Sequence, residues 1–344
     1  MDTKVYGTVG PACCGTEVLK QLFEKGMTGI RINLSHVNLS EVTGWVENIK
    51  AAYAVVKAQN PNQPELEMLI DLMGPEMRLG ELLAERTLKE GDRLTVMVEG
   101  KTNLFDPTEL PIPKPVFDEL EIGTTILIDD AKILLEVEEK RSRAAECIVR
   151  RGGILRSEKS IAIPGVTFET PTLTESDIKN IQEAKSFGIT GVMLPFVRGK
   201  DDLSNLKGAM EDAGAADMRI YAKIENELGV KNLEELLPFC DEIIIARGDL
   251  GNAIPLWELP VVQAQIAEIC NKAGVPFMIA TQMLASMETF AVPTRAEVSD
   301  IYRAVREGAA SVILTGETAI GKYPVEAIDF MVKTIKVAES YLRK

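Results

Sequence analysis

Charged side chains gather in two short segments that follow strand-like apolar runs. The first is AKIEN at 222–226, where Lys223 and Glu225 stand two positions apart. Residues two apart on a strand point to the same face, and charges on a buried face must be paired or bound to a ligand. A cation beside a carboxylate suits a site that neutralises a transferring anionic group next to a metal ion. An internal Lys–Glu salt bridge is the structural alternative.

The second segment, ARGDLG at 246–251, follows the next strand-like run. Its Gly248 lets backbone amides approach a ligand closely, and its Asp249 offers another carboxylate. Glu225 and Asp249 could share one Mg²⁺ ion, which prefers one or two carboxylates together with water and substrate oxygens. An ordinary Gly-Asp turn is the alternative.

Further oxygen donors follow two other strand-like runs. NLS at 33–35 supplies Asn33 and Ser35, and DLMGPEMR at 71–78 supplies Asp71. Neutral oxygens with one carboxylate suit a weakly hydrated monovalent ion, and polar capping is the alternative. TVGPACCG at 8–15 indicates a turn leading into a helix, where free amides can bind an anion, but it lacks the Gly-Lys-Ser/Thr of a P-loop.

Eight apolar runs alternate with amphipathic segments along most of the chain. Strands are expected at 5–9, 29–34, 67–72, 191–196, 219–224, 242–247, 276–281 and 311–316. These runs are apolar on both faces, as strands buried between a core and a helical layer must be. The pattern predicts an α/β fold, a (β/α)₈ TIM barrel, with a doubly wound sheet as the alternative. The carboxyl ends of barrel strands face the active site.

Helix signals mark the segments between the strands. Helices are expected at 16–26, 40–57, 174–188 and 295–308. Thr174 followed by Asp177 predicts a capping box with Asp in place of Glu, and Gly188 predicts a C-terminal cap.

A long segment after the third strand has a different pattern. Polar and apolar residues alternate there between Gly-containing turns, which predicts a small antiparallel β domain at 76–163 inserted in a βα loop. The barrel then comprises 1–75 and 164–344, which is 256 residues and close to the ~250 of a typical TIM barrel.

Composition excludes several classes of protein. With 38 basic and 52 acidic residues, the net charge of −14 disfavours nucleic-acid partners and anionic membranes. No run approaches the ~20 apolar residues of a membrane span. The five cysteines lack metal-ligand spacing and indicate reduced thiols in the cytoplasm. The single histidine, His36, excludes sites built from several histidines.

In this set of motifs the chain resembles the pyruvate kinases. The resemblance covers nearly the whole chain and is most specific in AKIEN, ARGDLG, ATQML, PTRAE and GETAIGKYP. It implies a (β/α)₈ barrel with a small antiparallel β-barrel lid domain inserted after strand 3, and transfer of the phosphoryl group of phosphoenolpyruvate to ADP, giving pyruvate and ATP. Such transfer proceeds by positioning and charge neutralisation, without a covalent intermediate.

The resemblance also implies roles for individual residues. Lys223, Arg31 and Thr281 would be catalytic, and the substrate would contact these three together with Gly248 and Asp249. Mg²⁺ or Mn²⁺ would bind Glu225 and Asp249. The K⁺ site would comprise Asn33, Ser35, Asp71 and the carbonyl of Leu72, and Glu76 predicts K⁺ dependence. Around the nucleotide the resemblance implies Thr8, Pro11, His36, Arg78 and Lys159.

Two departures from the family pattern affect these expectations. Leu72 and Met73 stand where the family usually has a Thr-Lys pair, which removes a cation while leaving a backbone oxygen for K⁺. The chain ends at Lys344, so we expect no C-terminal effector domain, no effector control of the usual kind, and a homo-oligomer through barrel helices in place of the usual tetramer. Two other functions stay open: a Mg²⁺-dependent 2-oxo-acid aldolase or decarboxylase, and a non-catalytic metabolite-binding homologue.

Overall fold

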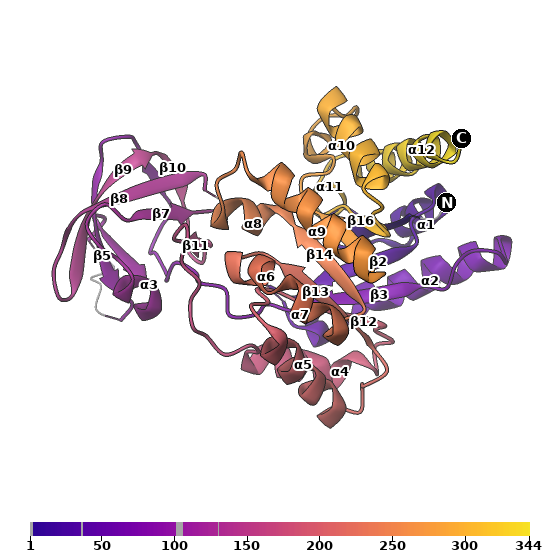
Figure 1. Ribbon diagram of the computed structural model, residues 1–344, viewed down its shortest axis with the longest axis horizontal. Coiled ribbons are helices and arrows are strands. Elements are labelled where there is room, and N and C mark those ends of the chain that lie inside the picture. Colours follow the sequence, from indigo (N-terminus) through magenta and orange to yellow (C-terminus); the bar gives the residue numbers. More distant parts are fainter. Residues whose placement is uncertain (1–2, 36, 101–105, 130) are drawn as a thin grey trace. The chain divides into compact units, whose positions relative to one another are not determined.

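A computed structural model describes residues 3–35, 37–100, 106–129 and 131–344 (Figure 1). The chain divides into two compact units. The barrel unit comprises Met1–Gly74, Thr172–Gly248 and Pro260–Lys344, and the insert unit comprises Pro75–Pro171 and Asp249–Leu259. The domain limits of 76 and 163 expected from the sequence stay a prediction.

Eight parallel strands close into a barrel in the barrel unit, which confirms the TIM-barrel prediction (Figure 1). Each strand pairs with its neighbours in chain order, and the last strand pairs with the first. The strands are β1 (Lys4–Thr8), β2 (Gly29–Asn33), β3 (Glu67–Asp71), β12 (Gly191–Leu194), β13 (Arg219–Ile224), β14 (Glu242–Ala246), β15 (Phe277–Ala280) and β16 (Ser311–Ile313). All eight fall on the apolar runs, because each strand is buried on both faces.

Large side chains fill the interior of the barrel. Tyr6 and Tyr221 are fully buried there and pack with Leu69, Met193 and Met278. Gly29 makes room for one of the aromatic rings, since a Cβ at Gly29 would lie 2.3 Å from the Tyr6 ring. The barrel is therefore a packed core, and ligands must bind at its ends.

Helices alternate with the barrel strands along the chain. They are α1 (Thr16–Lys25), α2 (Thr43–Gln59), α4 (Glu175–Ala184), α5 (Lys200–Asp212), α6 (Glu227–Lys231), α7 (Leu233–Leu236), α8 (Arg247–Ala253), α9 (Leu259–Ala273), α10 (Arg295–Arg306), α11 (Gly316–Ala319) and α12 (Pro324–Leu342). Short 3₁₀ helices occupy η1 (Leu39–Val42), η2 (Leu237–Phe239) and η3 (Ala285–Glu288). Among the described residues, no helix has both the length and the apolar character needed to span a bilayer.

The start of α4 agrees with the sequence, and its end does not. Thr174 and Asp177 form the predicted capping box, each side chain bonded to the backbone of the other. The prediction that Gly188 caps this helix is wrong, because the helix ends at Ala184 and Lys185 is the cap. Gly188 lies in the turn that follows, with a left-handed φ of 72° that disfavours other residues.

A polar network closes the amino-terminal end of the barrel. Glu67 accepts hydrogen bonds from Lys4 and Tyr6, while Glu242 accepts one from Ser311. Burial opposes ionisation of Glu67, but hydrogen bonds from Lys4 and Tyr6 lower its pKa below the ordinary value. Burial raises the pKa of Glu242, whose hydrogen bond from Ser311 only partly offsets that effect. The pKa values of the two carboxyl groups are therefore shifted in opposite directions.

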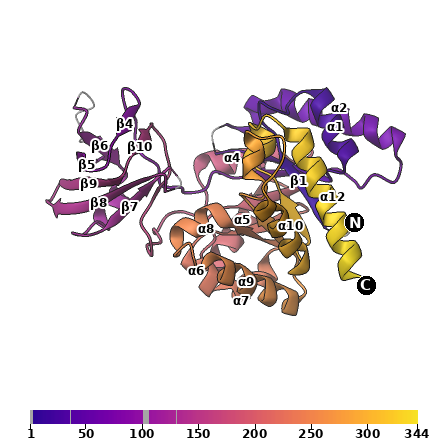
Figure 2. The same ribbon diagram turned by 90° about the horizontal axis from the view of Figure 1, so that it is seen from above.

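The insert unit is built on two sheets. The larger has the order β11-β7-β8-β9-β5-β6, and the smaller pairs β10 with β4 (Figure 2). The strands are β4 (Arg86–Leu88), β5 (Arg93–Val98), β6 (Glu109–Ile112), β7 (Thr125–Ile128), β8 (Ile133–Lys140), β9 (Ala144–Arg151), β10 (Gly153–Leu155) and β11 (Ile161–Ala162), and the short helix α3 (Lys114–Asp118) follows β6.

One strand pair of the insert unit departs from the expected antiparallel pattern. β5 and β6 run parallel, while the other paired strands of this unit are antiparallel. Alternation of polar and apolar residues is the same in both kinds of ladder, so it cannot reveal strand direction. The apolar face of each strand packs into one core of buried aliphatic side chains.

Candidate active site

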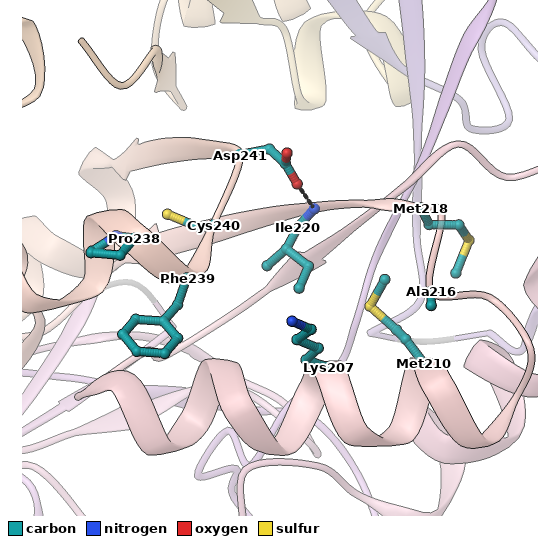
Figure 3. A pocket seen from close by; sticks show the side chains of 9 residues that line it. All are labelled: Lys207, Met210, Ala216, Met218, Ile220, Pro238, Phe239, Cys240 and Asp241. Atoms are coloured by element: carbon teal, nitrogen blue, oxygen red, sulfur yellow. Dashed lines mark hydrogen bonds between the residues drawn. The ribbon is translucent and has the colours of Figure 1, made fainter. Parts of the chain in front are cut away.

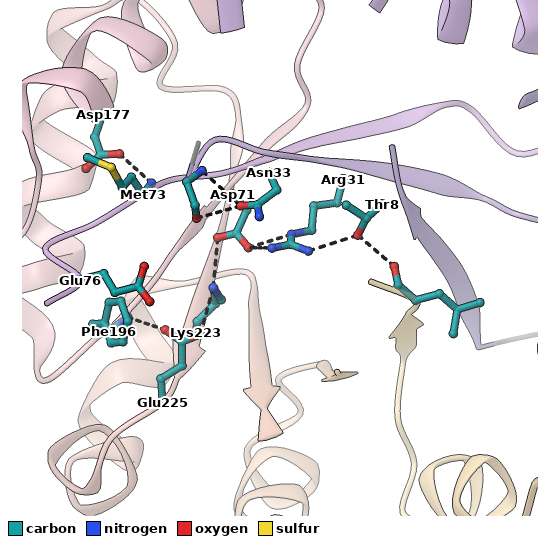
Figure 4. Close-up of polar contacts among 12 residues, drawn as sticks. Thr8, Arg31, Asn33, Asp71, Met73, Glu76, Asp177, Phe196, Lys223 and Glu225 are labelled. Carbon is teal, nitrogen blue, oxygen red and sulfur yellow. Dashed lines mark hydrogen bonds and ion pairs between the residues drawn. The ribbon is translucent and has the colours of Figure 1, made fainter. Parts of the chain in front are cut away.

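Most of the predicted site residues in the barrel unit lie at the carboxyl ends of neighbouring strands (Figure 4). Thr8, Asn33 and Asp71 are the last residues of β1, β2 and β3. Arg31 lies two positions before the end of β2, and Lys223 is the penultimate residue of β13. Asn33 stands opposite Asp71 in the β2·β3 ladder. The register of the barrel thus places these side chains at one rim.

Four charged groups of this rim form a continuous chain of ion pairs (Figure 4). Arg31 donates from Nε and from its terminal nitrogen to Asp71 Oδ2 at 2.8 and 2.7 Å. Lys223 Nζ lies 3.2 Å from Asp71 Oδ1 and 2.9 Å from Glu225 Oε1. Both carboxylates are 2% exposed, and both cations are 14% exposed as side chains. Charges this buried are stable because each has an opposite partner.

Glu225 has an arrangement suited to a metal ligand. It directly follows β13, and its Oε2 accepts a hydrogen bond of 2.8 Å from the Phe196 amide. Its other oxygen, Oε1, is buried and receives no well-aligned hydrogen bond from the described residues, although Lys223 Nζ lies nearby. A carboxylate oxygen with lone pairs to spare fits a hard cation such as Mg²⁺. Both the salt bridge and the metal ligand considered for this segment are therefore compatible with its geometry.

A set of oxygen donors surrounds the ends of β2 and β3. Asn33 Oδ1 accepts from the Ser35 amide and hydroxyl at 3.3 and 3.0 Å. Asp71 supplies a carboxylate, and Leu72 follows it with its amide bonded to the Met193 carbonyl at 3.1 Å. Amide, hydroxyl and carbonyl oxygens with one carboxylate have the donor chemistry that suits a monovalent cation.

The turn after β15 holds Thr281 against the start of α8. Thr281 Oγ1 accepts a hydrogen bond of 2.8 Å from the Gly248 amide. Thr281 and Gln282 have left-handed φ values of 69° and 53°, which are uncommon for residues other than glycine. Arg247 donates two hydrogen bonds to the Thr281 carbonyl, at 3.2 and 2.7 Å, and pairs with Asp300 at 2.6 Å. Arg247 therefore stabilises a strained turn at a predicted substrate contact.

Four of the groups that organise this rim are not among the site residues predicted above. Arg247 and Asp300 fix the Thr281 turn, and buried Glu317 accepts hydrogen bonds of 2.9 and 2.8 Å from the amides of Leu284 and Thr315. Asp177 bonds to the backbone that follows β3. Arg247 directly follows β14 and Glu317 closely follows β16, so both positions could have been read from the sequence. Asp177 of α4 and Asp300 of α10 lie far along the chain from the segments that they contact.

Thr8 and the predicted residues of the insert unit have contacts within their own units. The Thr8 hydroxyl donates to the Leu314 carbonyl at 2.9 Å and accepts from Arg31 at 3.2 Å. Arg78 pairs with Glu76 and donates to the Glu158 carbonyl at 2.9 Å.

Lys159, Pro11 and Asp249 lie in separate segments of the chain. Lys159 pairs with Asp129 at 3.0 Å, and Pro11 is exposed in the turn after β1. Asp249 lies in the first turn of α8, and its pairing with Glu225 stays a prediction. His36 lies outside the described residues.

A cavity of about 240 Å³ opens elsewhere on the barrel unit (Figure 3). Met218 and Asp241, which directly precede β13 and β14, line it together with Lys207 of α5. It therefore lies at the amino ends of the strands, away from the charged rim. Burial raises the pKa of Cys240 in its wall to about 12, so this thiol stays protonated at neutral pH.

Comparison with known proteins gives a consistent result. A family model described as pyruvate kinase, barrel domain, matches residues 1–328. The chain is 37% identical to the pyruvate kinase of Thermococcus litoralis, over 98% of this chain and 70% of that protein. It is 37% identical to the pyruvate kinase of Geobacillus stearothermophilus, over 96% of this chain and 55% of that protein. The pyruvate kinase of Clostridium acetobutylicum is 34% identical, over 98% of this chain and 70% of that protein.

Proposed function

Because the chain belongs to the pyruvate kinase family, we propose that it transfers the phosphoryl group of phosphoenolpyruvate to ADP, giving pyruvate and ATP. The chain of ion pairs from Arg31 through Asp71 and Lys223 to Glu225 carries the proposal. It sets two cations and two carboxylates at the end of a barrel where catalysis takes place in this fold. Phosphoryl transfer depends on such positioned charge more than on covalent chemistry.

In this proposal a terminal phosphate oxygen of ADP attacks the phosphorus of phosphoenolpyruvate. The bond from phosphorus to the enol oxygen breaks, its electron pair stays on that oxygen, and the resulting enolate takes up a proton on carbon. Lys223 and Arg31 neutralise the negative charge of the group in transit. Thr281, Gly248 and Asp249 hold the substrate carboxylate, with the Thr281 turn kept in place by Arg247.

Two cations and a nucleotide complete the proposed site. Glu225 and Asp249 would hold Mg²⁺ or Mn²⁺, which supplies charge neutralisation for the substrate oxygens. Asn33, Ser35, Asp71 and the Leu72 carbonyl would hold K⁺, with Glu76 favouring K⁺ dependence. Around the nucleotide we propose Thr8, Pro11, His36, Arg78 and Lys159.

The two other functions differ in what they require of this site. An aldolase or decarboxylase acting on 2-oxo acids would use Mg²⁺ and the enolate-binding groups without a nucleotide. A metabolite-binding homologue would bind the substrate without turnover. The relatives favour neither, since each is named pyruvate kinase. A cytoplasmic location, inferred from the free cysteines, and assembly through barrel helices remain predictions to be tested by fractionation and sedimentation.

The direct test measures pyruvate formation from phosphoenolpyruvate and ADP with Mg²⁺, in the presence and absence of K⁺. Lys223→Met should reduce kcat at least about 10²-fold, because it removes a cation from the group in transit. Lys207→Met is the matched control, since this lysine lies at the opposite end of the barrel. Mg²⁺-dependent binding of oxalate without any turnover would contradict the kinase and favour one of the other two functions.

A further inference from the structure

The Asp177 side chain makes more contacts than a helix cap requires. Its carboxylate is fully buried, with 0% of the residue exposed. Oδ2 accepts hydrogen bonds from the Thr174 amide and hydroxyl, at 2.9 and 2.7 Å, and these complete the capping box of α4. The carboxylate accepts two more bonds from the backbone that follows β3: Met73 N–H to Oδ1 at 2.9 Å and Gly74 N–H to Oδ2 at 3.2 Å.

These two additional bonds join distant parts of the barrel unit. The bonded residues are more than one hundred positions apart in the chain, and Figure 4 shows the Asp177 carboxylate directed at the Met73 amide. The capping box does not need them, because it is already complete with the bonds between Thr174 and Asp177. A buried carboxylate is costly unless donors compensate it, so losing these donors would destabilise the residue. The contact therefore links α4 firmly to the loop after β3.

Peptide geometry turns this link into control of one carbonyl group. The Leu72 carbonyl and the Met73 N–H belong to the same planar trans peptide, so they point in opposite directions. Once Asp177 holds the N–H, the carbonyl must face away from α4. The Leu72 amide is separately bonded to the Met193 carbonyl at 3.1 Å, which fixes the other side of the residue.

We propose that Asp177 is a positioning residue that aims the Leu72 carbonyl at the monovalent-cation site formed with Asn33, Ser35 and Asp71. The inference rests on the proposed function, which supplies the K⁺ site. It also explains how the site tolerates the Leu72–Met73 pair. The direction of the carbonyl is set through the backbone by a carboxylate on another helix, and the side chain of Leu72 is buried and apolar.

The chain offers a specific probe of this peptide. Leu72–Met73 is the only Leu-Met pair in the sequence. Protein labelled with carbonyl-¹³C leucine and ¹⁵N methionine therefore gives one carbonyl–amide correlation in a triple-resonance NMR spectrum. That signal reports the Leu72 carbonyl and the Met73 N–H together, without substrate and without turnover. Titration with KCl, at ionic strength kept constant with tetramethylammonium chloride, measures K⁺ binding at this carbonyl.

Asp177→Asn is the test variant, and Thr174→Ala is its matched control. An asparagine replaces one of the two acceptor oxygens by an NH₂ donor, so the amides of Thr174 and Met73, which bond to different oxygens of Asp177, cannot both keep their acceptor. Thr174→Ala weakens the same helix cap but leaves the hydrogen bonds that Asp177 accepts from the Met73 and Gly74 amides. We expect Asp177→Asn to raise the half-saturating K⁺ concentration by about 10- to 100-fold, as loss of an outer-shell partner does at metal sites. In Thr174→Ala that concentration should equal the parental value.

Four outcomes would overturn the proposal. The first is equal K⁺ affinity in Asp177→Asn and in the parent. The second is an equal loss of affinity in both variants, which would indicate a general effect of the helix cap. The third applies even if Asp177→Asn does not fold: rapid solvent exchange of the Met73 amide proton in the parent would show that Asp177 does not hold this peptide. A parent that forms pyruvate but shows no K⁺ shift would refute this inference alone, whereas a parent without turnover would refute the proposed function.

Discussion

Replacing Asp71 by asparagine should destabilise the barrel unit while leaving its shape unchanged. Asp71 is 2% exposed and is the only group that joins Arg31 to Lys223 among the described contacts. The asparagine side chain keeps one oxygen close to the position of a carboxylate oxygen, but it removes the negative charge between two largely buried cations. Breaking a buried ion pair from one side costs about 3–5 kcal/mol. We expect about 3 kcal/mol, the lower end of that range, because Lys223 keeps Glu225 as a partner.

This change is large enough to measure by urea unfolding and by calorimetry. A loss of about 3 kcal/mol lowers the ratio of folded to unfolded protein by about a hundredfold. It corresponds to a decrease of about 6–12 °C in Tm for a domain of this size. The matched control is Asp217→Asn, which removes a carboxylate from an exposed pair with Lys185 in the same unit. It should leave Tm unchanged.

The result that would refute this reasoning is a Tm for Asp71→Asn that coincides with the control. The two cations would then not depend on Asp71 for their stability, and the chain of ion pairs would be a poor description of the site. Both variants should be compared in the same buffer without phosphate or sulfate, since an anion bound between Arg31 and Lys223 would replace the missing charge.

Two further predictions concern the interior of the barrel. Burial raises the pKa of Glu242 above its ordinary 4.5, so above pH 4.5 the native state retains this proton while the unfolded chain loses it. Stability therefore falls as pH rises through this window, by at most about 1.4 kcal/mol per pH unit, and Glu242→Gln should abolish that part of the slope in urea titrations at a series of pH values. Gly29→Ala should destabilise the barrel by about 1–3 kcal/mol, because its Cβ would lie 2.3 Å from the Tyr6 ring, whereas Gly15→Ala, with no atom within 4 Å of its Cβ, should leave the unfolding midpoint nearly unchanged.

Barrel strands could be predicted from the sequence because burial on both faces leaves a clear apolar run for each of them. The helix start at Thr174 could be predicted for a similar reason, since a capping box uses residues three positions apart. The end of that helix could not, because Gly188 is required by the following turn and not by the helix. Local patterns therefore predict elements well, but not how a glycine between two elements is used.

That several candidate residues at strand ends share one rim could likewise be predicted, since strand order in a barrel brings them together. The contacts that orient them could not. Arg247 reaches the Thr281 carbonyl because of a left-handed turn that no residue type in the segment indicates. Asp177 has a sufficient local role as a cap, which conceals its bonds to Met73. Long-range contacts of this kind depend on backbone conformation at both ends, which sequence patterns do not specify.

Charge balance at the rim has a consequence for the order in which ligands bind. Arg31 and Lys223 are balanced by Asp71 and Glu225, so these four residues carry no net charge together. A phosphorylated carboxylate entering among them alone would add several negative charges to a site of low exposure, where unbalanced charge is costly. Cations held by Glu225 and Asp71 would offset that charge and would also compete with Lys223 and Arg31 for the same carboxylates, releasing both side chains toward the anion. Under the proposed function, anion and cations should therefore bind cooperatively. Omitting either Mg²⁺ or K⁺ should weaken the binding of oxalate by more than the loss of its direct contacts with that cation accounts for.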